Sequence, residues 1–141
     1  MMNKFLSAML LLTLAGMTGN SLAETTRIQK TDSVVESGYE RFIDSCAFCH
    51  GVDAKGGGAA SAMLSKQPAN LTQLAKNNGG KFPLAQVYAT IDGRDMPESH
   101  GLREMPVWGD LWSKSIPPEY AEFYVRARIL EIVLFLDSIQ E

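Results

Sequence analysis

The sequence predicts an all-α domain, and three stretches of apolar residues support that prediction. Apolar residues recur at helical spacing between residues 35 and 46, and again between residues 84 and 91. In residues 129–136 only Glu131 is polar, which is typical of a helix buried on nearly every side. A chain of 141 residues that forms these helices has room for a single hydrophobic core.

The first predicted helix runs from Ser33 to Cys46. Ser33 and Glu36 match the capping box S-x-x-E, so we expect the helix to begin at Ser33. Gly38 lies in its middle, where glycine costs about 1 kcal/mol of helix stability relative to alanine. We expect Gly38 to mark a close crossing with the apolar last helix, the alternative being a chance occurrence.

Shorter helices are predicted in the middle of the chain. One begins at residues 70–73 and ends at residues 77–80, whose asparagines and glycines tolerate left-handed backbone. Another begins near Pro83 and ends at Gly93. Its apolar face consists of Leu84, Val87, Tyr88 and Ile91.

A long connection follows over residues 94–115, and its apolar content indicates a packed, functional segment. The last helix opens at Pro117 and Pro118, because proline suits the first helical position. Glu122 and Arg126 have the i, i+4 spacing of an ion pair on this helix.

Residues 1–23 read as a signal peptide. Lys4 precedes an apolar run over residues 5–17, and small residues at 21 and 23 match the positions that a signal peptidase recognises. We therefore expect cleavage after Ala23, export to the periplasm, and one domain over residues 24–141. An uncleaved membrane anchor is the alternative, although the run is shorter than the roughly 20 residues of a span. The chain has 13 basic and 16 acidic residues, which argues against a nucleic-acid partner.

The chemistry of the chain centres on residues 46–50, which read Cys-Ala-Phe-Cys-His and contain both of its cysteines. C-x-x-C-H is the attachment motif of a c-type haem. Thiols three residues apart lie on one face of a helical turn, where they can reach the two vinyl groups of one porphyrin. His50 lies on the same face and can bind the iron as proximal ligand. The predicted cofactor is one covalently attached haem c, with its iron.

Two other chemistries remain possible for this motif. A redox dithiol would need an alternating strand–helix pattern around it, and that pattern is absent from the sequence. A zinc site could combine Cys46, Cys49, His50 and His100. Adjacent Cys49 and His50 cannot easily both point at one tetrahedral ion, however, and the spacing typical of zinc fingers is missing.

The sixth iron ligand is expected from a methionine. Met63 follows the motif too closely to reach the opposite porphyrin face, whereas Met96 and Met105 each precede a proline that fixes the backbone. The residues after Met96 are polar and those after Met105 are apolar. Because exclusion of water helps set the redox potential, Met105 is favoured; Met96, His100 and an open site are the alternatives.

These features resemble a monohaem class I cytochrome c of a bacterial periplasm or respiratory membrane. The matching stretches are residues 46–51, the glycine loop at 56–58, residues 91–94 and 101–109, and the apolar last helix. The resemblance implies an all-helical cytochrome c fold, in which the terminal helices cross near Gly38 and short helices and loops wrap one haem. It also implies Met105 as distal ligand. Many relatives orient the proximal histidine near a proline whose place Ala59 takes here, so the carbonyl that binds His50 is left open.

The function expected from this resemblance is one-electron transfer between redox proteins. With His50 and Met105 both bound to iron, no site is left for substrate, so the chain is not expected to be an enzyme. One alternative is a cytochrome subunit held permanently in an oxidase or dehydrogenase complex, which would associate with a membrane. Another is a haem enzyme or gas sensor whose sixth ligand leaves, although the sequence offers no distal acid–base pair for it.

Overall fold

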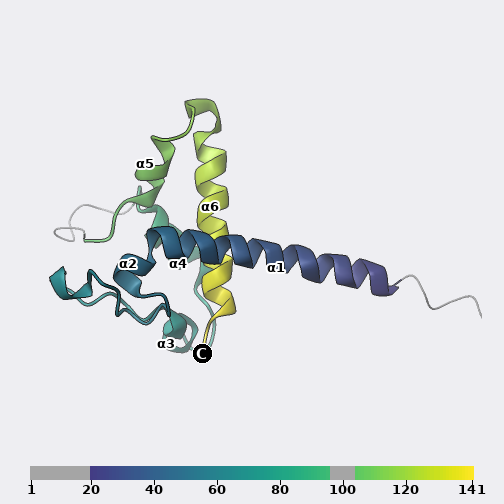
Figure 1. The fold of residues 1–141 in the computed structure, drawn as a ribbon, viewed down its shortest axis with the longest axis horizontal. Coiled ribbons are helices and arrows are strands. Elements are labelled where there is room, and N and C mark those ends of the chain that lie inside the picture. The colour runs from purple at the N-terminus through teal and green to yellow at the C-terminus, as the bar shows by residue number, and fades with distance from the viewer. Residues whose placement is uncertain (1–19, 96–103) are drawn as a thin grey trace, which may run out of the picture.

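The computed structural model describes residues 20–95 and 104–141, with residues 20–31 as backbone only. Every regular element in these ranges is helical and none is a strand, which confirms the all-α prediction for the described part of the chain (Figure 1). The elements are α1 (Asn20–Ser45), α2 (Ala47–His50), η1 (Ser61–Met63), η2 (Leu71–Gln73), α3 (Leu74–Asn77), α4 (Leu84–Asp92), α5 (Trp108–Ser113) and α6 (Pro118–Ser138).

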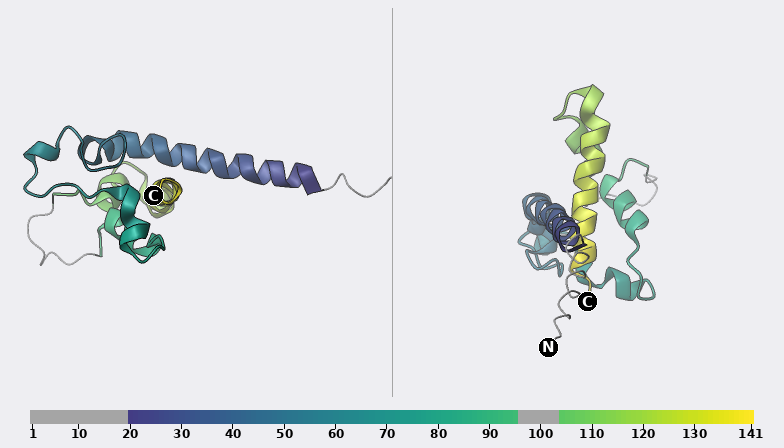
Figure 2. Two further views of the ribbon diagram at one scale, coloured as in Figure 1. Left: turned by 90° about the horizontal axis from the view of Figure 1, so that it is seen from below. Right: turned by 90° about the vertical axis from the view of Figure 1, so that its right-hand side faces the viewer.

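The two long helices, α1 and α6, cross steeply near the middle of α6 (Figures 1 and 2). Gly38 is buried at this crossing. A Cβ atom there would overlap the carbonyl oxygen of Glu131 and lie 2.9 Å from the Cβ of Phe135. The predicted close crossing at Gly38 is therefore confirmed, and its reason is the approach of one backbone to another.

The core is built mainly on α6. The largest fully buried side chains are one residue of α1 and four of α6: Phe42, Val125, Ile129, Ile132 and Val133. Phe135 adds ring contacts to α1, with its centroid 5.3 Å from that of Phe42 and 5.5 Å from that of Tyr39. The predicted burial of residues 129–136 is confirmed for most of them, but Leu130 keeps 44% of its surface exposed.

The start of α1 differs from the prediction. The helix begins at Asn20, so Ser33 is an interior residue whose carbonyl accepts a hydrogen bond from the Ser37 hydroxyl at 3.0 Å. The capping-box prediction was wrong because no glycine or proline between Asn20 and Ser37 stops the helix.

The predicted signal peptide is mostly outside the described residues, which exclude 1–19. Ala23, after which cleavage is predicted, lies in the first turn of α1, and the cleavage itself stays a prediction. Within the described ranges, no helix combines the length and apolar character needed to cross a membrane.

The short helices match their predicted limits. The Asn70 side chain accepts a hydrogen bond from the Thr72 amide at 3.0 Å and starts η2, which leads into α3. Gly93 ends α4 in the left-handed conformation, with φ of 72°.

Helix α5 was missed by sequence reasoning, which treated residues 94–115 as an irregular connection. Trp108 and Trp112 lie one turn apart in α5 and stack with ring centroids 5.0 Å apart. Their i, i+4 spacing is the signal that could have revealed the helix.

Candidate functional site

The motif of residues 46–50 forms a single helical turn. The His50 amide donates to the Cys46 carbonyl at 2.9 Å, and the Cys49 amide donates to the same oxygen at 3.1 Å. Cys46 and Cys49 are both half-buried and carry free thiols. The structure therefore places both cysteines and His50 on one helical turn that directly follows α1, as the spacing predicts.

The His50 ring is oriented by a backbone carbonyl. Its Nδ1 atom lies 3.1 Å from the carbonyl oxygen of Ala69. Since a carbonyl can only accept, Nδ1 carries the proton and donates it, which in the neutral ring leaves the lone pair on Nε2. The acceptor left open by the sequence is thus Ala69, ten positions beyond Ala59, where the resemblance places a proline in many relatives.

The glycine loop packs between the motif and the segment that carries Ala69. Gly56 has φ of 90°, and a Cβ atom there would overlap the Pro68 carbonyl oxygen. A Cβ atom on Gly58 would lie 2.6 Å from the Cys49 carbonyl oxygen. Only glycine fits at these two positions, so the loop sets the distance between His50 and the Ala69 carbonyl.

Gln140 and Glu141, which follow the C-terminal end of α6, fix the same segment. The Gln140 side chain donates to the Leu71 carbonyl at 2.8 Å and accepts from the Ala75 amide at 2.8 Å. The Glu141 amide donates to the Thr72 carbonyl at 2.8 Å. These contacts hold the backbone two to six residues after Ala69, and neither glutamine nor glutamate has a sequence signature for this role.

The thiol chemistry of the folded chain disfavours a redox dithiol. Burial, and secondarily the neighbouring Cys49, raise the pKa of the Cys46 thiol to about 12. Cys46 therefore stays protonated at neutral pH, whereas a reactive dithiol depends on a thiolate of low pKa.

The zinc alternative needs at least three ligand side chains that converge on one ion, and the described residues offer no such group. Nowhere in residues 20–95 and 104–141 do three or more His, Cys, Asp and Glu residues cluster so that they could hold a metal ion. His100, the fourth ligand in that alternative, lies outside the described residues, as does Met96.

Met105 lies in residues 104–107, the short segment that precedes α5 and is called the Met105 segment below. It is half-buried and packs against the same hydrophobic core as Cys46. The neighbouring Glu104 carboxylate accepts from the Ser65 amide at 2.6 Å and the Lys66 amide at 3.2 Å, which ties the segment to the loop after η1. The Ser65 hydrogen bonds lower the pKa of Glu104.

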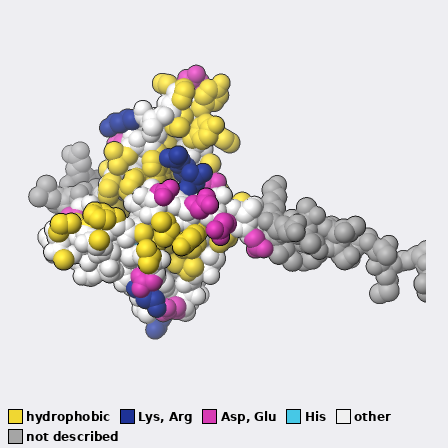
Figure 3. Space-filling model, in the orientation of Figure 1, with side chains coloured by type: hydrophobic (Ala, Val, Ile, Leu, Met, Phe, Trp, Pro, Cys, Tyr) yellow, Lys and Arg dark blue, Asp and Glu magenta, His cyan; other side chains and the backbone are white. Residues whose placement is uncertain are grey.

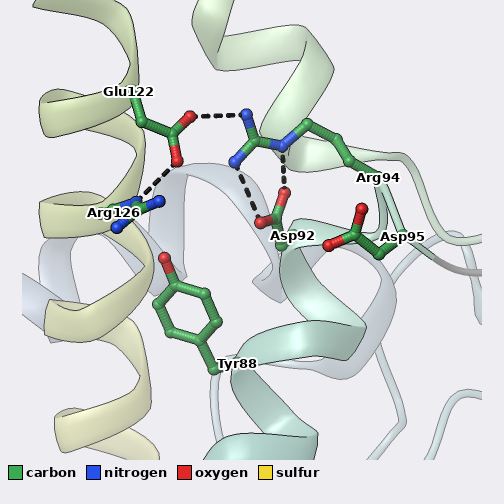
Figure 4. Close-up of a pocket in the computed structure, with 6 residues that line it drawn as sticks. All are labelled: Tyr88, Asp92, Arg94, Asp95, Glu122 and Arg126. Atoms are coloured by element: carbon green, nitrogen blue, oxygen red, sulfur yellow. Dashed lines mark hydrogen bonds and ion pairs between the residues drawn. The ribbon is translucent and has the colours of Figure 1, made fainter.

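A network of charged side chains joins the end of α4 to the start of α6 (Figure 4). Arg94 lies between Asp92 and Glu122, and Glu122 also accepts from Arg126 at 2.6 Å. The hydrogen bonds from Arg94, and then from Arg126, lower the pKa of Glu122 to about 2. The predicted Glu122–Arg126 ion pair is confirmed, but the part played by Asp92 and Arg94 was not foreseen.

Exposed apolar side chains include two groups. Phe48 within the motif, and Val52 and Met63 after it in the chain, are 62–74% exposed. Others gather over the first turns of α6 (Figure 3), where Tyr120, Phe123 and Tyr124 are exposed.

The donors present fit one haem: two thiols on one turn, an imidazole with a free Nε2, and a half-buried thioether. The assignment of a cofactor therefore rests on this donor set and not on similarity to a known protein. A comparison of the chain with protein-family models, curated proteins and solved structures finds no match.

Proposed function

We propose that this chain is an exported cytochrome c that carries single electrons between redox proteins. One haem c would be bound through Cys46 and Cys49, with His50 and Met105 as iron ligands. The observation that carries the proposal is the His50 ring, which lies on the same turn as both thiols while the Ala69 carbonyl leaves its Nε2 free for a metal.

Each residue has a defined task in this proposal. The thiols of Cys46 and Cys49 would supply the covalent bonds to the haem, and the Nε2 of His50 would supply a ligand to its iron. The Ala69 carbonyl keeps the imidazole in the correct tautomer and orientation. The apolar core against which Cys46 and Met105 pack excludes water. Bound haem iron would supply the one-electron redox chemistry.

The position of Met105 favours a carrier over an enzyme or gas sensor. Its side chain packs on the core, and Glu104 beside it is bound by two backbone amides. A thioether held in this way would keep the iron closed to substrate. The partners would be redox proteins, and no nucleic-acid partner is expected. A cytochrome subunit held permanently in a membrane oxidase or dehydrogenase would bind its haem through the same donors.

Covalent attachment is the first test. The full-length chain, co-expressed with a haem-attachment system and exported, should gain the mass of one haem. The double variant Cys46→Ala, Cys49→Ala should lose that mass. Phe48→Ala is the matched control, because Phe48 lies between the cysteines and is 62% exposed. A folded wild-type protein without haem from the periplasm would contradict the proposal.

Ligation is the second test. Met105→Ala should remove the weak red charge-transfer band of the oxidised protein and open the reduced protein to CO. Met63→Ala is the control, because Met63 is 73% exposed. All proteins are compared at equal haem content. Loss of the band in Met96→Ala, with the band intact in Met105→Ala, would transfer the ligand role to Met96.

A further inference from the structure

The charged network joins Arg94 to Asp92 and Glu122. It lies against the first turn of α5, which follows Met105 in the chain. The Arg94 guanidinium binds the Asp92 carboxylate with two parallel hydrogen bonds, Nε–Oδ1 at 2.5 Å and Nη2–Oδ2 at 3.0 Å. Its Nη1 atom reaches Glu122 on α6 at 2.8 Å (Figure 4). This two-point geometry fixes the plane of the guanidinium as well as its position.

Helix α5 rests directly on this ion pair. Gly109, in the first turn of α5, is buried, and a Cβ atom there would overlap the Asp92 carboxylate and lie 2.5 Å from the Arg94 Nε atom. A side chain at position 109 would therefore displace either the ion pair or the helix. The missing Cβ lets α5 approach Arg94 as closely as it does.

A second set of contacts holds α5 along its length. Trp108 stacks on Trp112, which lies in the core and is only 8% exposed. The Arg128 guanidinium of α6 lies 5.8 Å from the centre of the Trp112 ring. The first turn of α5 is thus held at Gly109 by the ion pair, and at Trp108 through its stack on the buried Trp112.

We propose that Arg94 and Gly109 are positioning residues that place the Met105 segment for iron ligation. Met105 precedes Gly109 by four residues, so a shift of the first turn of α5 moves the thioether with it. This inference rests on the proposed function. Arg94 acts through α5 and is not itself a ligand.

Replacing Arg94 would remove its hydrogen bonds to Asp92, and the strength of these bonds sets how far the Met105 segment should be displaced. The Arg94 and Asp92 side chains are only 28% and 16% exposed, and their hydrogen bonds are charge-assisted. Breaking such a pair raises the population of a displaced state by about tenfold. Arg126 touches the same Glu122 but is 69% exposed, so its replacement should matter much less.

The experiment uses two matched pairs of variants in the haem-loaded protein. Gly109→Ala is compared with Leu111→Ala, because Leu111 lies in the same helix and is 46% exposed. Arg94→Gln is compared with Arg126→Gln. The readouts are haem mass, the red charge-transfer band, the CO-binding rate of the reduced protein and the helix signal.

We expect Gly109→Ala and Arg94→Gln to keep haem and helix content, while the fraction of iron lacking the thioether rises about tenfold. The two controls should match the wild type. Arg94→Lys separates geometry from charge, since lysine keeps the charge but cannot form the two parallel bonds. Only a partial recovery of the band is expected from it.

The outcomes separate this inference from the function on which it rests. If Gly109→Ala does not fold, Arg94→Gln alone decides. An unchanged band and unchanged CO kinetics in Arg94→Gln, with haem and the band present in the wild type, would overturn the positioning role and leave the carrier function intact. A wild type without haem would overturn both.

Discussion

The two ends of α6 are attached to the rest of the molecule by different kinds of contact. At the C-terminal end, Gln140 and the Glu141 amide bind backbone atoms of the segment that follows Ala69. At the N-terminal end, Glu122 binds Arg94 through an ion pair. The first end supports the His50 side of the site and the second supports the Met105 side.

This difference teaches that the two sides should respond differently to solution conditions. Amide and carbonyl groups do not titrate and are little affected by salt, whereas exposed ion pairs weaken with both acid and salt. The Met105 side depends on the carboxylates of Asp92, Glu104 and Glu122. We therefore expect the His50 side to be the more constant of the two.

The largest effect should come from the crossing that supports both ends. Gly38→Ala places a Cβ atom into the backbone of Glu131, which cannot rotate away as a side chain could. We expect a decrease of about 3 kcal/mol in the free energy of unfolding, measured with urea. Gly57→Ala is the control, and equal stability of the two variants would show that the helices do not approach so closely.

A smaller decrease is expected at the C-terminal end. Gln140→Ala removes hydrogen bonds to Leu71 and Ala75 and leaves half-buried backbone groups unpaired, at a cost of about 2 kcal/mol. The decrease should be the same in low and high salt, because no charge is involved. The exposed Gln86→Ala serves as control. A decrease that shrinks with salt would contradict the contrast between the two ends.

At the N-terminal end we expect a dependence on acid. The pKa of Glu122 is lowered from 4.5 to about 2, so its ionised form stabilises the fold above pH 4.5. That contribution disappears as the pH falls from 4.5 toward 2. The fluorescence of Trp108 and Trp112, the two tryptophans of the chain, reports on α5 during an acid titration. Glu122→Gln should flatten the change in this range, and an unaltered titration would exclude Glu122 as its source.

The smallest effect concerns the charged pair at the C-terminal end. Lys55 and Glu141 lie 2.8 Å apart, but their side chains are 52% and 47% exposed. Lys55→Gln should change the urea midpoint by no more than its experimental error. A measurable destabilisation that disappears in salt would mean that charge matters at both ends of α6.

Sequence patterns found most helices because their apolar residues repeat at a period that burial imposes. They also found the Cys46–His50 turn and the crossing at Gly38, since each has a residue type that chemistry or space requires. The role of Ala69 could not be found, because a backbone carbonyl is common to every residue. The role of Gly109 could not be found either, because a side chain there is excluded only by the contact of α5 with the Asp92–Arg94 pair.

The crossing of α1 and α6 also has a kinetic consequence. Its ion pair joins Arg41 to Glu131, which are 90 positions apart in the chain. Closing a loop of that length costs about 4 kcal/mol of chain entropy, so the crossing should form late in folding. Residues 46–50 lie within the loop, and Cys46 and Cys49 are half-buried once it has closed. We therefore expect any attachment chemistry at Cys46 and Cys49 to take place on the open chain, before α6 meets α1.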